Sequence, residues 1–312
     1  MELKGLGRYR LVQALDIASA NCRFFLARHE DEPETDDPPS YIAKVLQPLR
    51  GHEAERRRAQ FDHEIKLLKS VNHPCIPSLH AAGDQDGVPY IVQDRVHGIP
   101  LSQLLGHDRG EPRALSKEIA VYVVAQLADA LRHIHTLEYL EAGEPTPLAV
   151  VHRDLCPSNI LLSNRGDVIL SDFGKAGSAW LADAHNDPTA GALAYKAPER
   201  VMPDGIASVK TDLFSVAVML WEALRGERCF AGANDAATRD AIARFDISQA
   251  SRRVPGLSPK LSEVLRKNLD RDPERRYPDA YKMLQRLAQS PEAGVAEQSR
   301  EQLAELVTTA MG

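Results

Sequence analysis

The stretch Val150–Lys175 constrains the fold more than any other part of this 312-residue chain. It contains a His-Arg-Asp tripeptide that ends at Asp154, with Asn159 five residues further on, and an Asp-Phe-Gly tripeptide that begins at Asp172. Between these signatures lie two short apolar runs, separated by a polar turn at Ser163–Asp167. The pattern predicts a β-hairpin of two short strands that carries an acidic residue or an amide at each end.

The polar groups at the ends of this hairpin are those that phosphoryl transfer needs. One carboxylate can orient an attacking hydroxyl, while an amide and a second carboxylate can hold the Mg2+ ions that neutralise the phosphates. The stretch resembles the catalytic loop and the magnesium loop of eukaryotic-type serine/threonine protein kinases, including the bacterial ones. The resemblance implies that Asp154 orients the substrate hydroxyl and accepts its proton, and that Asn159 and Asp172 ligate Mg2+.

The resemblance extends over nearly the whole chain and implies the fold class. That class is α+β, a bilobal protein-kinase-like fold with a small β-rich N-lobe and a larger helical C-lobe. We expect the N-lobe at about residues 9–93, the hinge at about 94–98 and the C-lobe at about 99–289. The kinase domain would then occupy residues 1–289, and residues 290–312 would form a C-terminal tail with the apolar spacing of an amphipathic helix.

The N-lobe contains the first pair of expected site residues. Lys44 lies inside the apolar strand predicted at Tyr41–Leu46, where a charged group needs a partner. The helix predicted at His52–Val71 has apolar residues at i, i+4 and i+7, and Glu64 lies beside that apolar face. The resemblance implies that Lys44 positions the α- and β-phosphates of ATP and that Glu64 holds Lys44.

The remaining ATP contacts follow from the resemblance as well. Backbone groups of Asp94, Arg95 and Val96 would read the adenine edge, and Leu161 is a further expected ATP-binding residue. The turn at Asp16–Asn21, which covers the ATP phosphates in the family, contains no glycine here. Glycine lets backbone N–H groups approach phosphate closely because it has no Cβ. We therefore expect ATP to bind weakly, through Mg2+ and the strand lysine more than through this turn.

Three positions downstream match residues that support the family's C-lobe. Asp212 lies near the start of an apolar helix predicted at Ser208–Glu222, and a buried carboxylate there needs hydrogen-bond donors. In the resembling kinases it holds the backbone of the catalytic loop. Glu199, in an Ala-Pro-Glu tripeptide, is expected to pair with Arg276, which ends an Asp-Pro-x-x-Arg motif.

Two segments that precede Val150–Lys175 have patterns that indicate their structure. Ser116 is the expected N-cap of a buried helix at Ile119–Leu137. The segment Glu138–Ala149 contains one glycine and two prolines, and we expect it to be an inserted loop.

The segment Lys175–Ala197 resembles the activation segment of protein kinases. Ser178 and Thr189 are candidate phosphorylation sites within it. Arg153, beside the catalytic aspartate, is the type of residue that pairs with such a phosphate and thereby orders a loop. The alternative is an ordered segment with two ordinary surface hydroxyls.

The expected site has five polar positions, and all are filled, by Lys44, Glu64, Asp154, Asn159 and Asp172. This favours an enzyme that transfers the γ-phosphate of ATP to Ser or Thr hydroxyls of protein substrates. Pro157 favours this acceptor class over tyrosine. In addition to the glycine-free turn, two residues depart from the family. Cys156 replaces a lysine near the γ-phosphate, and Ala192 replaces a threonine that contacts the catalytic aspartate; because these two are neighbours in the family, we expect them to be coupled.

These departures leave open a pseudokinase that acts as a binding or scaffold module. A small-molecule kinase of the aminoglycoside or choline type is a further alternative. The Ala-Pro-Glu segment, Asp212 and Arg276 argue against it, because they build a peptide-binding C-lobe.

Composition limits the remaining classes of function. The net charge of −6 gives no support to nucleic-acid binding, which usually needs a basic face. No apolar run approaches the ~18 residues of a membrane span, and no secretory signal is visible, so we expect a cytoplasmic protein. The four cysteines show no C-x-x-C spacing, which favours reduced thiols. A protein substrate is the expected partner, and the sequence assigns no oligomeric state.

Overall fold

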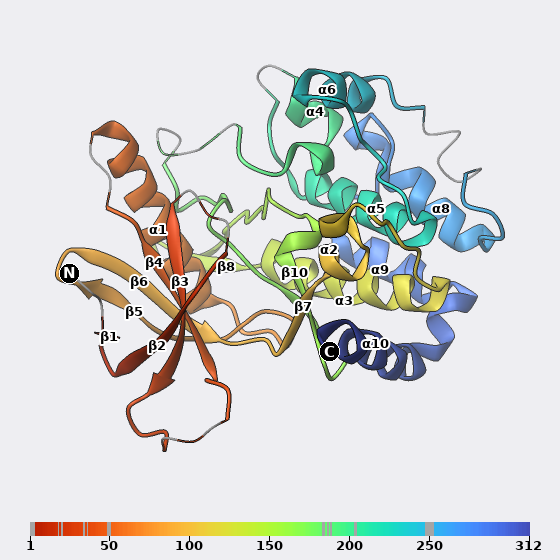
Figure 1. Cartoon of the computed structure of the whole chain (residues 1–312). Coiled ribbons are helices and arrows are strands. Elements are labelled where there is room, and N and C mark those ends of the chain that lie inside the picture. Colours follow the sequence, from red (N-terminus) through yellow and green to blue (C-terminus); the bar gives the residue numbers. More distant parts are fainter. Residues whose placement is uncertain are drawn as a thin grey trace. The chain divides into compact units, whose positions relative to one another are not determined.

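The computed structural model describes residues 4–17, 19, 21–33, 35, 37–48, 51–182, 185, 187, 189–202, 205–246 and 253–312. The chain divides into two compact units (Figure 1). Unit 1 comprises Met1–Val96 and Trp180–Asn186, and unit 2 comprises His97–Ala179 and Asp187–Gly312. A β-rich N-terminal unit and a helical C-terminal unit confirm the predicted α+β class.

Unit 1 is built on one antiparallel sheet with the strand order β1-β2-β3-β4-β6-β5. Its strands are β1 (Gly5–Leu6), β2 (Tyr9–Leu15), β3 (Cys22–His29), β4 (Tyr41–Leu46), β5 (Leu79–Gln85) and β6 (Val88–Asp94). Alternating apolar residues, among them Phe25, Ala43, Val45 and Val92, form a buried cluster on one face of the sheet. This alternation is why the apolar residues on either side of Lys44 turn away from it.

Helix α1 (His52–Ser70) packs against β5 and β6. The predicted helix ends one residue later than the observed one. Phe61 and Leu68 are buried as the pattern indicates, and Glu64 lies between them, at i+3 from Phe61 and only 2% exposed. The inward face of the helix therefore includes the carboxylate, which the spacing predicted to lie beside the apolar stripe.

Unit 2 contains a three-stranded sheet and most of the helices. The sheet has the order β11-β10-β7, from β7 (Gly98–Pro100), β10 (Ile160–Ser163) and β11 (Val168–Leu170). The α-helices of the described part of this unit are α2 (Leu101–Leu104), α3 (Lys117–His135), α4 (Pro198–Val201), α5 (Val209–Arg225), α6 (Asp235–Ala243), α8 (Pro259–Asn268), α9 (Ala280–Ala288) and α10 (Ala296–Met311). Short 3-10 turns occur at His107–Arg109, Pro157–Asn159, Leu193–Tyr195, Pro273–Arg275 and Pro291–Val295.

Helix α3 is the centre of unit 2 and contacts α5, α9 and α10 (Figure 1). The Ser116 side chain accepts a hydrogen bond from Ile119 N at 3.2 Å, which confirms the predicted N-cap. The predicted hairpin is also present, because β10 and β11 pair antiparallel with Ile160 opposite Leu170.

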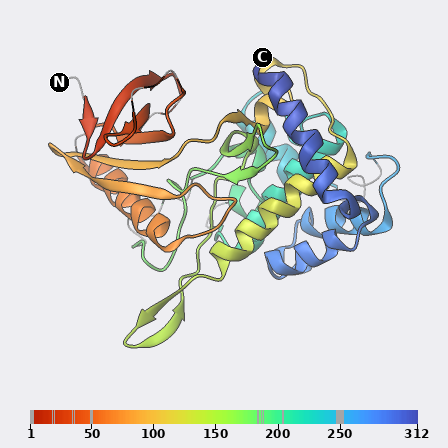
Figure 2. The ribbon, with the colours of Figure 1, turned by 90° about the horizontal axis from the view of Figure 1, so that it is seen from below.

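The segment predicted to be a loop at Glu138–Ala149 is instead mostly a β-hairpin, so that prediction is wrong. Its strands are β8 (Glu138–Glu141) and β9 (Glu144–Pro147), and Figure 2 shows it extending away from the helices of unit 2. Ala142 and Gly143 both have positive φ, 52° and 90°, which is the geometry of a tight hairpin turn. A two-stranded ribbon has edges on both sides, so its prolines need not donate to a ladder.

The C-terminal tail is helical, as expected, and is part of unit 2. Helix α10 packs on α3, β7 and β10 (Figure 2), and the side chains of Leu303 and Val307 are fully buried. Arg300 forms an ion pair at 2.7 Å with Asp167 in the turn between β10 and β11. Within the part of the chain that the structure describes, no helix is both long and apolar enough to cross a membrane.

Candidate active site

The unit 1 site residues centre on an ion pair between β4 and α1. Lys44 Nζ lies 2.8 Å from Glu64 Oε1 and 2.9 Å from Oε2, and the two side chains are 11% and 2% exposed. The structure thus brings together the lysine and the glutamate that the sequence assigned to ATP binding. A carboxylate this deeply buried holds the ammonium in one place, because it would be costly to leave either charge alone.

The expected hinge residues follow β6. The Asp94 and Arg95 N–H groups donate to Ser78 O at 3.2 Å and Ser40 O at 2.9 Å, so both are engaged inside unit 1. For Val96 N–H, no acceptor is recorded among the described residues. Of the N–H groups of these three residues, that of Val96 is therefore the one available to a ligand.

The Asp94 side chain is fixed by its own contacts. It accepts from His80 Nε2 at 2.6 Å and from Ser78 N at 3.0 Å. Burial alone would raise the pKa of this carboxyl, but the hydrogen bonds from His80 and Ser78 outweigh it and lower the pKa. The side chain of Asp94 therefore has a structural role, which is separate from the expected contact of its backbone with adenine.

The glycine-free turn connects β2 to β3. Ser19 Oγ accepts hydrogen bonds from Asn21 N at 3.4 Å and Cys22 N at 3.2 Å. The hairpin predicted here is therefore present, although Ala18 and Ala20 lie outside the described residues.

In unit 2 the hairpin β10–β11 positions the second group of site residues. Asn159 Nδ2 donates to Asp154 O at 2.8 Å, and Ser171 N donates to Asn159 O at 2.9 Å. Asp172, directly after Ser171, has a φ of 61°, which is uncommon outside glycine and typical of functional sites. These contacts fix Asp154, Asn159 and Asp172 to one rigid element. Leu161, between buried neighbours in β10, lies on the opposite, partly exposed face.

The backbone of the catalytic loop is hydrogen-bonded to Asp212. Its carboxylate accepts from His152 N at 2.8 Å, Arg153 N at 3.0 Å and His135 Nε2 at 2.9 Å. Full burial would raise the pKa of this carboxyl, but the hydrogen bond and charge of His135 and the contacts of His152 lower it instead. The expected contact between Asp212 and the backbone of the catalytic loop is therefore present. In that loop, Arg153 adopts a positive φ of 68°.

His135 is a positioning residue that the sequence-based prediction did not include. A signal was available in the spacing. Leu127 and Leu131 are fully buried, and His135 follows them at i+8 and i+4 on the same face of α3.

The Asp-Phe-Gly tripeptide is anchored to the same loop. The Phe173 ring is buried and lies edge-on to His152, with centroids 5.0 Å apart. Further along, Gly177 and Val151 exchange two backbone hydrogen bonds, each 2.9 Å. A Cβ at Gly177 would overlap the guanidinium of Arg153, so a larger residue there would displace that side chain from its present position.

The two candidate phosphorylation sites have different surroundings. Ser178 is half-buried and follows Gly177, the residue against which the Arg153 guanidinium lies. Thr189 is exposed, and its hydroxyl donates to Asp187 Oδ1 at 2.7 Å. Their phosphorylation stays a prediction.

Two buried pairs stabilise the end of the activation segment. Arg276 Nη1 and Nη2 bond the two oxygens of Glu199, both at 2.7 Å, in the predicted pair. The Tyr195 hydroxyl donates to Glu222 Oε2 at 2.7 Å, a pair that the sequence interpretation missed. Burial raises the pKa of Glu222, although its hydrogen bonds with Tyr195 and Cys229 act the other way.

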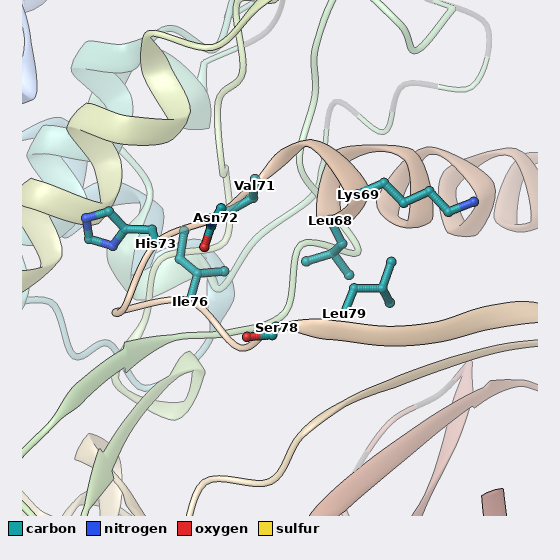
Figure 3. A pocket seen from close by; sticks show the side chains of 8 residues that line it. All are labelled: Leu68, Lys69, Val71, Asn72, His73, Ile76, Ser78 and Leu79. Atoms are coloured by element: carbon teal, nitrogen blue, oxygen red, sulfur yellow. The ribbon is translucent and has the colours of Figure 1, made fainter. Parts of the chain in front are cut away.

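A pocket of about 260 Å³ in unit 1 lies between the C-terminal end of α1 and the start of β5. Figure 3 shows Leu68 and Leu79 approaching each other there from helix and strand. Its lining contains none of the residues predicted for catalysis or ATP binding.

Comparison with known proteins identifies the family. A family model described as "Protein kinase domain" matches residues 34–287, more than half of the chain. The chain belongs to the protein kinase domain family. The glycine-free turn at Asp16–Asn21 precedes the matched range.

The kinase domain is similar to several curated bacterial proteins. It is 26% identical over 225 residues to serine/threonine-protein kinase PrkC of Bacillus subtilis (strain 168), covering 72% of this chain and 32% of PrkC. It is 30% identical over 233 residues to serine/threonine-protein kinase PknB of Mycobacterium tuberculosis (strain ATCC 25177 / H37Ra), covering 72% and 34%. It is also 30% identical over 221 residues to tyrosine-protein kinase MasK of Myxococcus xanthus (strain DK1622), covering 70% and 34%. The chain spans about a third of the length of these relatives.

The donor atoms of the kinase domain fit Mg2+. This ion takes oxygen ligands and is usually bound by one or two carboxylates together with substrate phosphates. Asp172 supplies a carboxylate, and Asn159 supplies an amide oxygen, since its amide nitrogen already donates to Asp154 O. The two expected ligands lie at the two ends of the β10–β11 hairpin.

Proposed function

We propose that this kinase domain transfers the γ-phosphate of ATP to Ser or Thr hydroxyls of protein substrates. The observation that carries the proposal is the arrangement of Asn159 and Asp172 at the two ends of the β10–β11 hairpin, with Asp154 bonded to Asn159 and the catalytic loop hydrogen-bonded to buried Asp212. Phosphoryl transfer depends on positioning and charge stabilisation more than on covalent chemistry, so rigid polar groups are what it requires.

Each site residue has a role in this proposal. Asp154 orients the acceptor hydroxyl and takes its proton, while Asn159 and Asp172 ligate Mg2+, which neutralises charge on the phosphates. Lys44, held by Glu64, positions the α- and β-phosphates. Val96 N–H, with neighbouring groups of the hinge, binds the adenine edge, and Leu161 contacts the nucleotide from β10.

The acceptor class is the part of the proposal that needs a direct test. Pro157 favours Ser and Thr, and PrkC and PknB are named serine/threonine kinases, whereas MasK is named a tyrosine kinase. Purified protein with ATP and Mg2+ should be offered peptides that are identical except for a single Ser, Thr or Tyr. We expect phosphate on Ser or Thr, and a loss of about 10²–10³-fold in Asp172→Asn. Transfer to the Tyr peptide alone would contradict the proposed acceptor class.

A nucleotide-binding scaffold is the second candidate function. It is favoured by three departures from the family: the glycine-free turn, the buried thiol of Cys156 in place of a lysine near the γ-phosphate, and Ala192 in place of a threonine that contacts the catalytic aspartate. ATP binding without any transfer, in the same peptide assay, would support the scaffold.

A further inference from the structure

The carboxylate of Asp154 has two recorded contacts. Its Oδ1 accepts a hydrogen bond from Ala192 N at 2.9 Å. Its Oδ2 lies 3.6 Å from Lys175 Nζ. Lys175 directly follows the Asp-Phe-Gly tripeptide, and its side chain is 47% exposed. An ion pair this open stabilises a fold very little, so the contact needs another explanation.

In the family, the positions of Cys156 and Ala192 carry polar side chains near the catalytic aspartate. In this chain, neither side chain can supply the positive charge of a lysine. The Cys156 side chain is buried, and a thiol carries no positive charge in either of its protonation states. Ala192 offers only its backbone N–H. Among the residues that the structure describes, Lys175 is the cation recorded within ion-pair distance of this carboxylate.

The backbone on both sides of Lys175 is fixed. Phe173 and Ala176 are buried, and Ala176 N donates to Phe173 O at 3.0 Å, which closes a turn around Lys175. Gly177 is then tied to Val151 by two hydrogen bonds. The ammonium is therefore presented from a rigid loop that also carries Asp172, the expected metal ligand.

We propose that Lys175 is a catalytic residue that supplies, from the magnesium loop, the positive charge that Cys156 does not supply from the catalytic loop. The inference rests on the proposed kinase function. In the transfer, the acceptor oxygen bonds to the γ-phosphorus as the bond to the β,γ-bridging oxygen breaks. The acceptor proton passes to Asp154, and ADP leaves. Lys175 moves from the Asp154 carboxylate to the γ-phosphoryl oxygens and stabilises their charge.

The first test measures binding and does not depend on turnover. Calorimetry with Mg2+ compares the affinities for ATP and ADP, which differ by the γ-phosphate. The wild type should prefer ATP, and Lys175→Met should lose about tenfold of that preference, as expected for a charge-assisted contact. Lys175→Arg should retain it. The control is Lys282→Met, which removes an exposed lysine on α9 that bonds only Gln285 and should behave as wild type.

The second test is a rescue of catalysis. Lys175→Met should lower kcat about 10²-fold with little change in the KM of the peptide. Adding Cys156→Lys should restore at least about tenfold in that background, because a lysine at either position reaches the same phosphate.

The outcomes separate this inference from the proposed function. An ATP preference and a kcat that are unchanged in Lys175→Met overturn the inference and leave the kinase activity standing. A wild type that binds ATP but transfers nothing contradicts the proposed function, and the ATP–ADP comparison then decides on Lys175 by itself. A wild type that binds no ATP overturns both.

Discussion

Asp212 shows how one buried side chain can determine the geometry of a catalytic loop. Its carboxylate holds two consecutive backbone N–H groups, those of His152 and Arg153, and a ring nitrogen of His135. Three donors on one buried carboxylate make its charged form the stable one, even though burial alone opposes it.

A lowered pKa at Asp212 predicts how stability depends on pH. The folded-state pKa lies below the unfolded value, so the stabilisation is fully present above about pH 4 and is lost as pH falls through the folded pKa. Asp212→Asn should therefore cost about 1–3 kcal/mol at neutral pH and should flatten the acid limb of the unfolding free energy.

This prediction can be checked by urea denaturation of both proteins between about pH 3 and pH 7. Asp240→Asn, at an exposed carboxylate on α6, is the matched control and should keep the wild-type profile. A parallel loss in the wild type and Asp212→Asn at every pH would show that the Asp212 charge is not the cause.

The identities of the main site residues could be predicted because each lies in a contiguous motif. Asp154, Asn159 and Asp172 belong to two short signatures at a fixed spacing, and Lys44 interrupts an apolar strand. The partners His135 and Glu222 were missed. They belong to no local motif, and their contacts join segments that the fold brings together.

Arg276 connects three elements of unit 2. It pairs with Glu199 of α4, donates to Lys210 O in α5 and to Asp270 O after α8, and its side chain is fully buried. Its guanidinium also lies over the Phe214 ring, 4.9 Å from the centroid.

Removal of Arg276 should destabilise unit 2 strongly. Arg276→Ala leaves the Glu199 carboxylate without its partner, and breaking a buried ion pair in this way costs about 3–5 kcal/mol. The neighbouring Arg275 is 74% exposed and 3.6 Å from Asp272, so Arg275→Ala should cost less than about 1 kcal/mol. Denaturant unfolding of the two variants gives the comparison, and equal losses would contradict this role of Arg276.

The helices and strands differ in how well the sequence indicated them. Helix α3 could be predicted because Ser116 caps a long apolar stripe, and β10–β11 because polar turn residues separate two apolar runs. The β8–β9 hairpin could not, since Pro145 and Pro147 argue against strands in general and are tolerated only at the edges of a ribbon. The burial of α10 depends on α3 and on the Asp167 ion pair, which no local pattern contains.

Over the whole molecule, the chain carries the parts of a phosphoryl-transfer enzyme in two compact units. Unit 1 contains the Lys44–Glu64 pair and the expected adenine contact, and unit 2 contains the catalytic loop and the expected metal ligands. The residues that depart from the family, Cys156 and Ala192, lie beside Asp154 and affect the charge around it. They leave in place the network that holds the loop. The account therefore predicts an active enzyme.

The most direct test of this claim separates nucleotide binding from transfer at Asp154. Purified wild type and Asp154→Asn are compared with labelled ATP and Mg2+, measuring ATP affinity by calorimetry and phosphate incorporation into an acceptor peptide in the same preparations. Because Asp154 acts on the acceptor hydroxyl, the variant should bind ATP within about threefold of wild type and transfer phosphate about 10²–10⁴-fold more slowly. Equal incorporation by wild type and Asp154→Asn would contradict the account.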